Sequence, residues 1–165
     1  MNKTAQNWID NLNLLPLAEG GYFNRYFTSQ QIIPKNILEK FSGDRHSATK
    51  IYYLLEEGQL SVFHKIKQEE VWDFMYGDPL ELVLLSPLTG LSNILLGSDP
   101  DLGTVLSYTV SADTWMAAHS LGDYTLLTCT CSPGFDDDDY TLATRETLSN
   151  QFPEHAEIIK FFTKL

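Results

Sequence analysis

The sequence contains few cysteines and no long apolar segment. Cys129 and Cys131 are its only cysteines. Two residues apart on a strand, they would point to the same face, where a disulfide between them would be strained, so we interpret them as buried thiols. No apolar run approaches the roughly 20 residues that cross a bilayer, and the first ten residues lack the apolar region of a signal peptide. We therefore expect a cytoplasmic protein without a disulfide framework.

Basic residues are also scarce. The chain has 11 Lys and Arg against 22 Asp and Glu, which gives a formal net charge of −11. This charge repels phosphate backbones and anionic membrane surfaces, so we expect neither nucleic acid nor membrane as a partner. Gly-x-Ser-x-Gly and the glycine-rich phosphate-binding loops are absent, which argues against an α/β-hydrolase or a nucleotide site. The expected ligand is a small molecule.

Short runs rich in β-branched and aromatic residues, separated by turn signals, fill the sequence between residues 48 and 131. Eight runs follow one another: 48–55, 59–66, 70–76, 80–86, 92–96, 105–111, 114–119 and 124–131. Such closely spaced strands are typical of an antiparallel sandwich or barrel rather than of alternating βαβ units. We predict one all-β domain over residues 1–165.

Apolar residues at helical spacing predict a short helix at each end of this domain. The first covers residues 4–15, with Thr4 as its N-cap and Pro16 after its end. The second covers residues 155–165, with an apolar stripe formed by Ile158, Ile159, Phe162 and Leu165. Residues 34–47 are predicted to form a polar loop that extends from the domain. The acidic run 136–139 is predicted to be a solvated loop or a helix N-terminus.

Two adjacent strands carry the residues of greatest functional interest. On the first, His64 would share a face with Leu60, Val62 and Ile66, and on the second, Glu70 would share a face with Trp72, Phe74 and Tyr76. A hairpin between these strands would bring His64 and Glu70 together inside an aromatic-walled cavity. Such a cavity, apolar with few polar groups, is the usual form of a small-molecule site.

The same region resembles the first cupin motif, which is a glycine, a His-x-His pair, a glutamate and a final glycine. Gly58, His64, Glu70 and Gly77 match in spacing, with Ile66 in place of the second histidine. From about residue 14 to residue 135, the segments GGYFNRYF, YYLL, SVFHKI, EEVWDFMYGDPLEL, TWMAAH and CSPGF resemble, in that order, a small branch of the cupin superfamily. The barrel of that branch is similar to the barrel of the dTDP-sugar 3,5-epimerases.

This resemblance implies a cupin double-stranded β-helix, an RmlC-like jelly roll, and a homodimer. It constrains the fold more than the reaction. The branch usually has His-Pro-Glu-Gly-Gly at its first motif, whereas this chain has Leu17 and Ala18 in front of Glu19. Any role of that histidine is therefore missing here.

One hypothesis for the function is acid–base chemistry of the isomerase or epimerase type. A histidine oriented by a carboxylate is a competent general base. By resemblance to the epimerases, His64 with Glu70 would remove a proton next to a carbonyl, and a tyrosine would return one. The candidate acids are Tyr22, Tyr26, Tyr53 and Tyr76.

A second hypothesis is the binding of a small polar metabolite, either sugar-like or bearing a carboxylate. Aromatic side chains provide flat walls, and charged residues hold polar edges. The candidate walls are Trp72, Trp115, Tyr22 and Phe23, and the candidate clamp is Glu19 with Arg25. Tyr53 and His119 complete the expected ligand-binding set.

A third hypothesis is a divalent transition-metal centre, although we favour no cofactor. Its ligands would be His64, Glu70 and His119, because Ile66 and Met116 occupy the other positions where a cupin metal ligand is expected. The remaining alternative is a non-catalytic dimeric scaffold.

Overall fold

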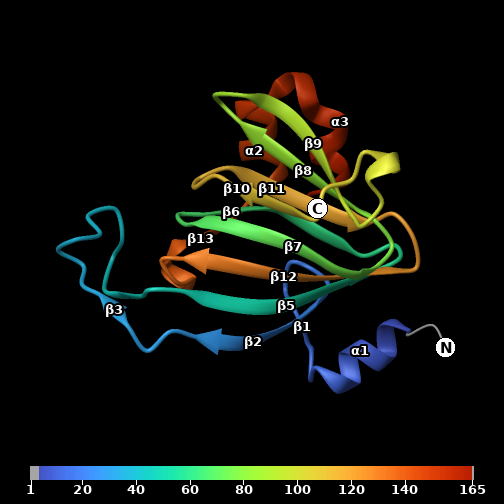
Figure 1. The fold of residues 1–165 in the computed structure, drawn as a ribbon. Helices are drawn as coiled ribbons and strands as arrows, with labels where there is room; N and C mark the ends of the chain where they lie inside the picture. Colours follow the sequence, from blue (N-terminus) through green and yellow to red (C-terminus); the bar gives the residue numbers. More distant parts are fainter. Residues whose placement is uncertain (1–3, 165) are drawn as a thin grey trace.

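Two antiparallel β-sheets face each other in the computed structural model, which describes residues 4–164 (Figure 1). Their strands are β1 (Leu15–Pro16), β2 (Tyr22–Thr28), β5 (Thr49–Glu56), β6 (Leu60–Ile66), β7 (Glu69–Gly77), β8 (Leu80–Ser86), β9 (Gly90–Leu96), β10 (Ser107–Val110), β11 (Trp115–Ser120), β12 (Tyr124–Ser132) and β13 (Tyr140–Leu142). In the described residues, the six-stranded sheet has the order β1-β2-β5-β12-β7-β10 and the five-stranded sheet the order β13-β6-β11-β8-β9. A separate pair, β3 (Ile32–Ile33) and β4 (Arg45–His46), lies beyond β2.

The runs predicted between residues 48 and 131 all form strands, one run to each of the strands from β5 to β12. Apart from the β8–β9 hairpin, successive strands of this series alternate between the two sheets. The predicted all-β jelly roll is therefore confirmed. Strands β2 and β13, by contrast, were not among the predicted runs, and both contribute to the site described below.

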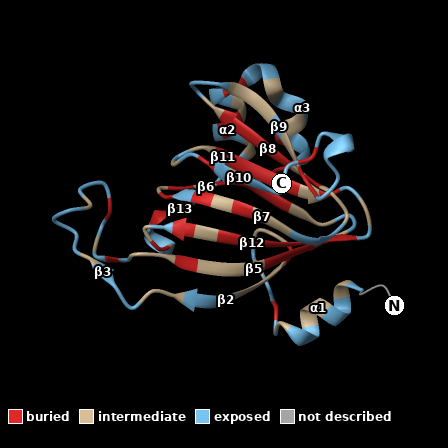
Figure 2. Cartoon of the chain, viewed as in Figure 1, coloured by how far each residue is buried: buried red, intermediate tan, exposed pale blue. Residues whose placement is uncertain are grey.

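The main hydrophobic core lies between the sheets. Leu55, Trp72 and Leu127 contribute to it from the six-stranded sheet, and Leu82 and Met116 from the five-stranded sheet. Figure 2 shows this burial along the middle strands, while the long β3–β4 connection is largely exposed. Removing a large apolar side chain from water contributes about 1.5–3 kcal/mol, so this layer holds the two sheets together.

Helices cover the outer face of each sheet. The helices α2 (Arg145–Gln151) and α3 (Ala156–Phe161), together with the short turn η3 (Pro153–His155), lie on the five-stranded sheet. There Phe152, Ile159 and Phe162 contact Phe63 and Trp115. The helix α1 (Ala5–Asn11) covers part of the six-stranded sheet, where its apolar residues pack against Leu54 and Leu126 (Figure 1).

Both terminal helices are shorter than predicted. Thr4 is the N-cap of α1, as predicted, but the helix ends at Asn11, and Leu15 pairs with Phe23 in β1. A positive φ of 52° at Asn13 turns the chain between these two elements. The helix α3 ends at Phe161, and Leu165 of the predicted stripe lies outside the described residues. No helix within residues 4–164 is long and apolar enough to cross a membrane.

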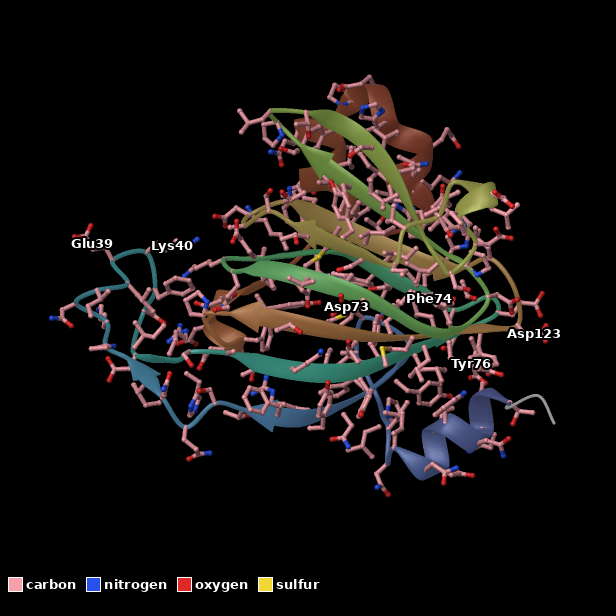
Figure 3. All side chains as sticks on the ribbon, viewed as in Figure 1. Glu39, Lys40, Asp73, Phe74, Tyr76 and Asp123 are labelled. Atoms are coloured by element: carbon pink, nitrogen blue, oxygen red, sulfur yellow. The ribbon has the colours of Figure 1, made fainter. Side chains whose placement is uncertain are left out.

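The acidic run is not simply solvated. Asp139, in the short turn η2 (Asp137–Asp139), is buried and forms an ion pair with Arg45 of 2.7 Å, while Gln68 donates a hydrogen bond of 2.7 Å to the same carboxylate. This correction to the solvated-loop prediction has a clear cause, because a buried carboxylate is stable when a cation and hydrogen-bond donors surround it. The pair anchors the long β3–β4 connection, whose tip carries Glu39 and Lys40 (Figure 3).

Candidate functional site

A cavity of about 620 Å³ lies between the two sheets, at the end where β2, β5, β6 and β13 come together. The six-stranded sheet lines it mainly with Phe23, Ile51, Tyr53, Glu70, Trp72, Cys129 and Cys131. The five-stranded sheet contributes Ser61, His64, Ile66 and Tyr140. Its volume lies within the range of small-molecule sites.

A β-bulge in β6 determines which of its residues reach the cavity. Met116 of β11 pairs with His64, and Ala118 pairs with Ser61, so β6 contains one extra residue in this stretch. Ser61 and His64 therefore both line the cavity, whereas Leu60 packs on the outer face. The predicted regular alternation of Leu60, Val62, His64 and Ile66 is wrong in its first half, although the interior position of His64 is confirmed.

His64 is a buried, neutral imidazole. Its Nδ1 lies 2.8 Å from the carbonyl oxygen of Val62, to which a protonated Nδ1 donates. Burial lowers the pKa of His64, and this hydrogen bond only partly opposes the effect. With its proton on Nδ1, the ring presents Nε2 as a hydrogen-bond acceptor. Tyr140 of β13 stacks against the ring, with centroids 5.5 Å apart.

Glu70 on β7 is a buried carboxyl group without a cationic partner in the described residues. Trp72 donates a hydrogen bond of 2.9 Å from Nε1 to Glu70 Oε2, and Cys131 Sγ lies 3.7 Å from Oε1. Burial raises the pKa of Glu70 to about 7, because these two hydrogen bonds lower it less than desolvation raises it. The group therefore exchanges its proton near neutral pH.

His64 and Glu70 line the same cavity, as predicted, but the predicted hairpin between their strands is wrong, because β6 and β7 belong to different sheets. No hydrogen bond joins the two groups among the described side chains. The carboxylate is instead held by Trp72 and Cys131, and the histidine by a backbone carbonyl. The expectation that Glu70 orients His64 is therefore not met. Because each group is held by its own hydrogen-bond partners, each can act on a ligand independently.

Tyr53 stands at the back of the cavity and is almost completely buried. Its hydroxyl donates a hydrogen bond of 2.9 Å to the carbonyl oxygen of Gly20, and burial raises its pKa. Gly20 has a φ of 120°, and a Cβ there would lie 1.9 Å from the carbonyl oxygen of Leu60, so only glycine fits. This close approach of the backbone at Gly20 accompanies the position of residues 17–19 at the cavity.

That segment forms one side of the cavity rim. Leu17, Ala18 and Glu19 all line the cavity, so the difference from the usual His-Pro-Glu pattern falls directly on its wall. Burial raises the pKa of Glu19. Arg25 and Asp137 are exposed and complete the charged part of the rim.

Two predicted site residues lie on the wrong face of β11. Trp115 packs under the C-terminal helices, where its Nε1 donates a hydrogen bond of 3.1 Å to Gln151. His119 Nε2 lies 2.9 Å from Glu81 Oε2, and its ring contacts Phe162. Alternation along β11 places both side chains outside the barrel, because the inward positions belong to Met116 and Ala118.

The metal hypothesis fails on this geometry. His119 cannot join His64 and Glu70 in one coordination sphere from the opposite face of the sheet. Within residues 4–164, no group of three or more His, Cys, Asp or Glu is arranged to hold a metal ion. The residues present therefore do not fit the predicted centre.

The other predicted tyrosines also lie outside the cavity. Tyr22 packs with the α1 cluster, and Tyr26 stacks on Tyr52 at 4.1 Å. An irregularity in β7 turns Tyr76 away from the face of Phe74 and toward α1, where it contacts Trp8 at 5.5 Å (Figure 3). Of the four candidate acids, only Tyr53 lines the cavity.

Sequence reasoning missed several residues of the cavity, chiefly Ser61, Phe135, Asp137 and Tyr140. Phe135 and Tyr140 form an edge-to-face pair at 6.4 Å across the loop that contains the acidic run. Nothing in their local pattern indicates a strand or a site. The two cysteines could have been placed there, because alternation along β12 gives them the face that Glu70 occupies on the paired strand β7.

Comparison with known proteins supports the fold. The sequence pattern of a family described as "Cupin superfamily (DUF985)" matches residues 6–143. The chain belongs to this family. No curated protein matches it.

Two solved structures resemble this cupin along almost its whole length. A hypothetical protein from Leishmania major has 28% identity and a TM-score of 0.90, with 99% of this chain and 100% of that chain covered. Protein SO0799 from Shewanella oneidensis has 27% identity and a TM-score of 0.88, with 99% of both chains covered. Oxalate decarboxylase from Bacillus subtilis has 12% identity and a TM-score of 0.55 over 89% of this chain and 36% of that chain, which shows a shared fold alone. The likeness to the epimerases stays a prediction.

Proposed function

We propose that the cavity binds a small polar metabolite and exchanges a proton with it in an isomerase-type reaction. One observation carries this proposal: Glu70 is a buried carboxyl group, without a cationic partner in the described residues, in a cavity of about 620 Å³, and its pKa is about 7. A purely structural carboxylate is normally paired with a cation or exposed to water. An unpaired one in a cavity is a good candidate for proton transfer.

Glu70 and His64 differ in protonation state and therefore have different proposed roles. At neutral pH Glu70 is present both as carboxylate and as carboxylic acid, so it can remove a proton from a carbon next to a carbonyl and return it. His64 stays neutral and offers Nε2 to a hydroxyl of the ligand. The rings of Phe23, Tyr53 and Trp72 provide apolar walls around such a molecule.

Binding is tested by thermal unfolding of the wild-type protein with a panel of small hydroxy acids, keto sugars and amines. A ligand that binds the folded state raises the melting temperature. Glu70→Gln and His64→Ala should each reduce the rise. Glu81→Gln, which changes a carboxylate outside the barrel, should leave it unchanged. If no compound raises the melting temperature, or if both cavity variants keep the rise, the binding proposal is wrong and the scaffold alternative stands.

Catalysis is tested separately with a compound that binds. In deuterated water the wild-type protein should incorporate deuterium next to the carbonyl of that ligand, and proton NMR should show the loss of the corresponding signal. Glu70→Gln should reduce the exchange at least about a hundredfold, as is typical for removal of a general base. Binding without exchange would leave a binding protein and refute the isomerase step.

The homodimer implied by the family resemblance stays a prediction. Light scattering on the protein as it elutes from a size-exclusion column distinguishes the 18.7 kDa monomer from a particle of twice that mass. A monomer at all concentrations would contradict it.

A further inference from the structure

The charged groups around the cavity are mostly acidic. Glu70 is buried in it, Glu19 is half-buried at its side, and Asp137 lies at its rim. The charge of Glu19 contributes to raising the pKa of Glu70 and of Tyr140, so the carboxylates act on one shared space. An anionic ligand would be repelled by this field, and a cationic ligand would be attracted.

Two cations do not reverse this balance. Lys164 donates to the carbonyl oxygen of Ala18 and its charge lowers the pKa of Glu19, but it does not line the cavity, whereas Arg25 does. It carries the one permanent positive charge among the described residues that line the cavity, and its side chain is exposed. Its guanidinium lies over the ring of Phe135, 5.5 Å from the centroid. Ring faces attract cations in this way, so the cavity rim already holds one positive group by an aromatic contact.

Aromatic rings continue from the rim into the cavity. Tyr53 and Trp72 meet edge to face at 5.9 Å, and Tyr140 links Phe135 to His64 on the opposite wall. Ring faces combined with a carboxylate form the environment that recognises alkylated ammonium groups. A bare metal ion fits poorly, because the described residues offer no cluster of three ligands.

The polar groups at the back add a position for a hydroxyl. Ser61 Oγ is buried beside the Tyr53 hydroxyl and forms no hydrogen bond of regular geometry. His64 offers Nε2 nearby on the same strand. A ligand with an ammonium group at one end and a hydroxyl at the other would satisfy both parts of the cavity.

We propose that the cavity binds a small alkylated ammonium compound, with Glu70 and Glu19 balancing its charge and the aromatic rings contacting its alkyl groups. This inference rests on the proposed function, since it concerns the same cavity, and it names the ligand class. Entry of a cation favours the ionised form of Glu70. Binding near neutral pH therefore releases protons from the protein.

The test uses three probes of similar shape and different charge: choline, 3,3-dimethylbutan-1-ol and 3,3-dimethylbutanoate. Titration calorimetry at pH 7 should show choline binding about tenfold tighter than the neutral alcohol, the size of one desolvated cation–π contact. The carboxylate should bind weakest. In buffers of different ionisation enthalpy, the apparent heat of choline binding should reveal proton release.

Variants localise the effect. Glu70→Gln should remove most of the preference for choline and all of the proton release, while the affinity for the alcohol stays within about twofold. Glu19→Gln, on the rim, should weaken choline binding less. Arg25→Gln should strengthen it, because a like charge is removed. Glu81→Gln is the control outside the cavity and should change nothing.

The outcomes separate this inference from the proposed function. If the alcohol or the carboxylate binds as tightly as choline, the ammonium class is wrong, while a cavity that binds metabolites remains. If the Glu70→Gln and Glu19→Gln variants both bind choline as tightly as the wild-type protein does, the choline site lies elsewhere and the inference fails. If none of the three binds, the inference also fails, and the metabolite panel then decides the proposed function by itself.

Discussion

Two buried carboxyl groups, Glu70 and Asp139, differ in what surrounds them. Both are less than one-tenth exposed. Burial raises the pKa of each, but around Asp139 the hydrogen bonds from Arg45 and Gln68 and the charges of Arg45 and Lys67 outweigh it, so that its pKa is lowered. Glu70 has only Trp72 and Cys131, and its pKa is about 7.

This difference separates an anchor from a candidate reactive group. A carboxylate surrounded by cations and donors is stable as an ion and holds two chain segments together. In an apolar cavity without a cation, the ionised form of a carboxyl group is destabilised. Such a group therefore gains or loses a proton in the pH range where enzymes work. Burial alone therefore does not mark a functional carboxylate, whereas burial without a cationic partner does.

The largest loss of stability is expected when the ion pair between Asp139 and Arg45 is broken. Asp139→Asn leaves Arg45 buried without its counter-ion, and we expect a loss of about 3–5 kcal/mol in the free energy of unfolding. Urea unfolding followed by tryptophan fluorescence measures this loss. Asp138→Asn changes an exposed carboxylate in the same run and should cost little. Equal losses in the two variants would refute the distinction.

A second effect is expected in the pH dependence of stability through Glu70. Its pKa is raised from 4.5 to about 7 in the folded state, so the folded protein keeps this proton to higher pH than the unfolded chain does. The resulting stabilisation is complete below pH 4.5 and is lost as the pH rises through 7, with a total of about 3 kcal/mol. Denaturation at a series of pH values should show that Glu70→Gln removes this component. Identical pH profiles for the variant and the wild type would contradict the raised pKa.

A smaller effect is expected on the pKa of Glu70 when one of its hydrogen-bond donors is removed. Trp72→Phe removes the N–H group that donates to Oε2, and this hydrogen bond favours the ionised carboxylate. We therefore expect the pKa of Glu70 to rise further. Carbon-13 NMR of the labelled carboxyl group measures it directly. An unchanged or lowered value would mean that the indole does not support the ion.

The smallest effect is expected at His119, which the sequence suggested as a metal ligand. Its pair with Glu81 is about one-quarter exposed on both sides, and such pairs contribute less than about 1 kcal/mol. His119→Gln should therefore change stability little and leave cavity binding unchanged in calorimetry. Loss of ligand binding in this variant would show that His119 contributes to the site.

The candidate site was only partly predictable. The interior position of His64, the face shared by Glu70 and Trp72, and the place of Tyr53, Glu19 and Arg25 at the cavity agree with the prediction. Trp115 and His119 were placed wrongly, because alternation gives the relative faces of a strand but not which face is the inside. Tyr22 and Tyr76 were misplaced by the outward packing against α1 and by the irregularity in β7.

The sequence by itself determined the all-β architecture, the order of strands β5 to β12 and the interior position of His64. These follow from local properties, namely β-propensity, turn residues and the two-residue period of a strand. The tertiary structure decided the rest. It placed the bulge that turns Ser61 inward, brought Tyr140 against His64 from far along the chain, and paired Asp139 with Arg45 instead of water. Contacts between distant segments set partners and pKa values, and no local pattern records which segments will meet.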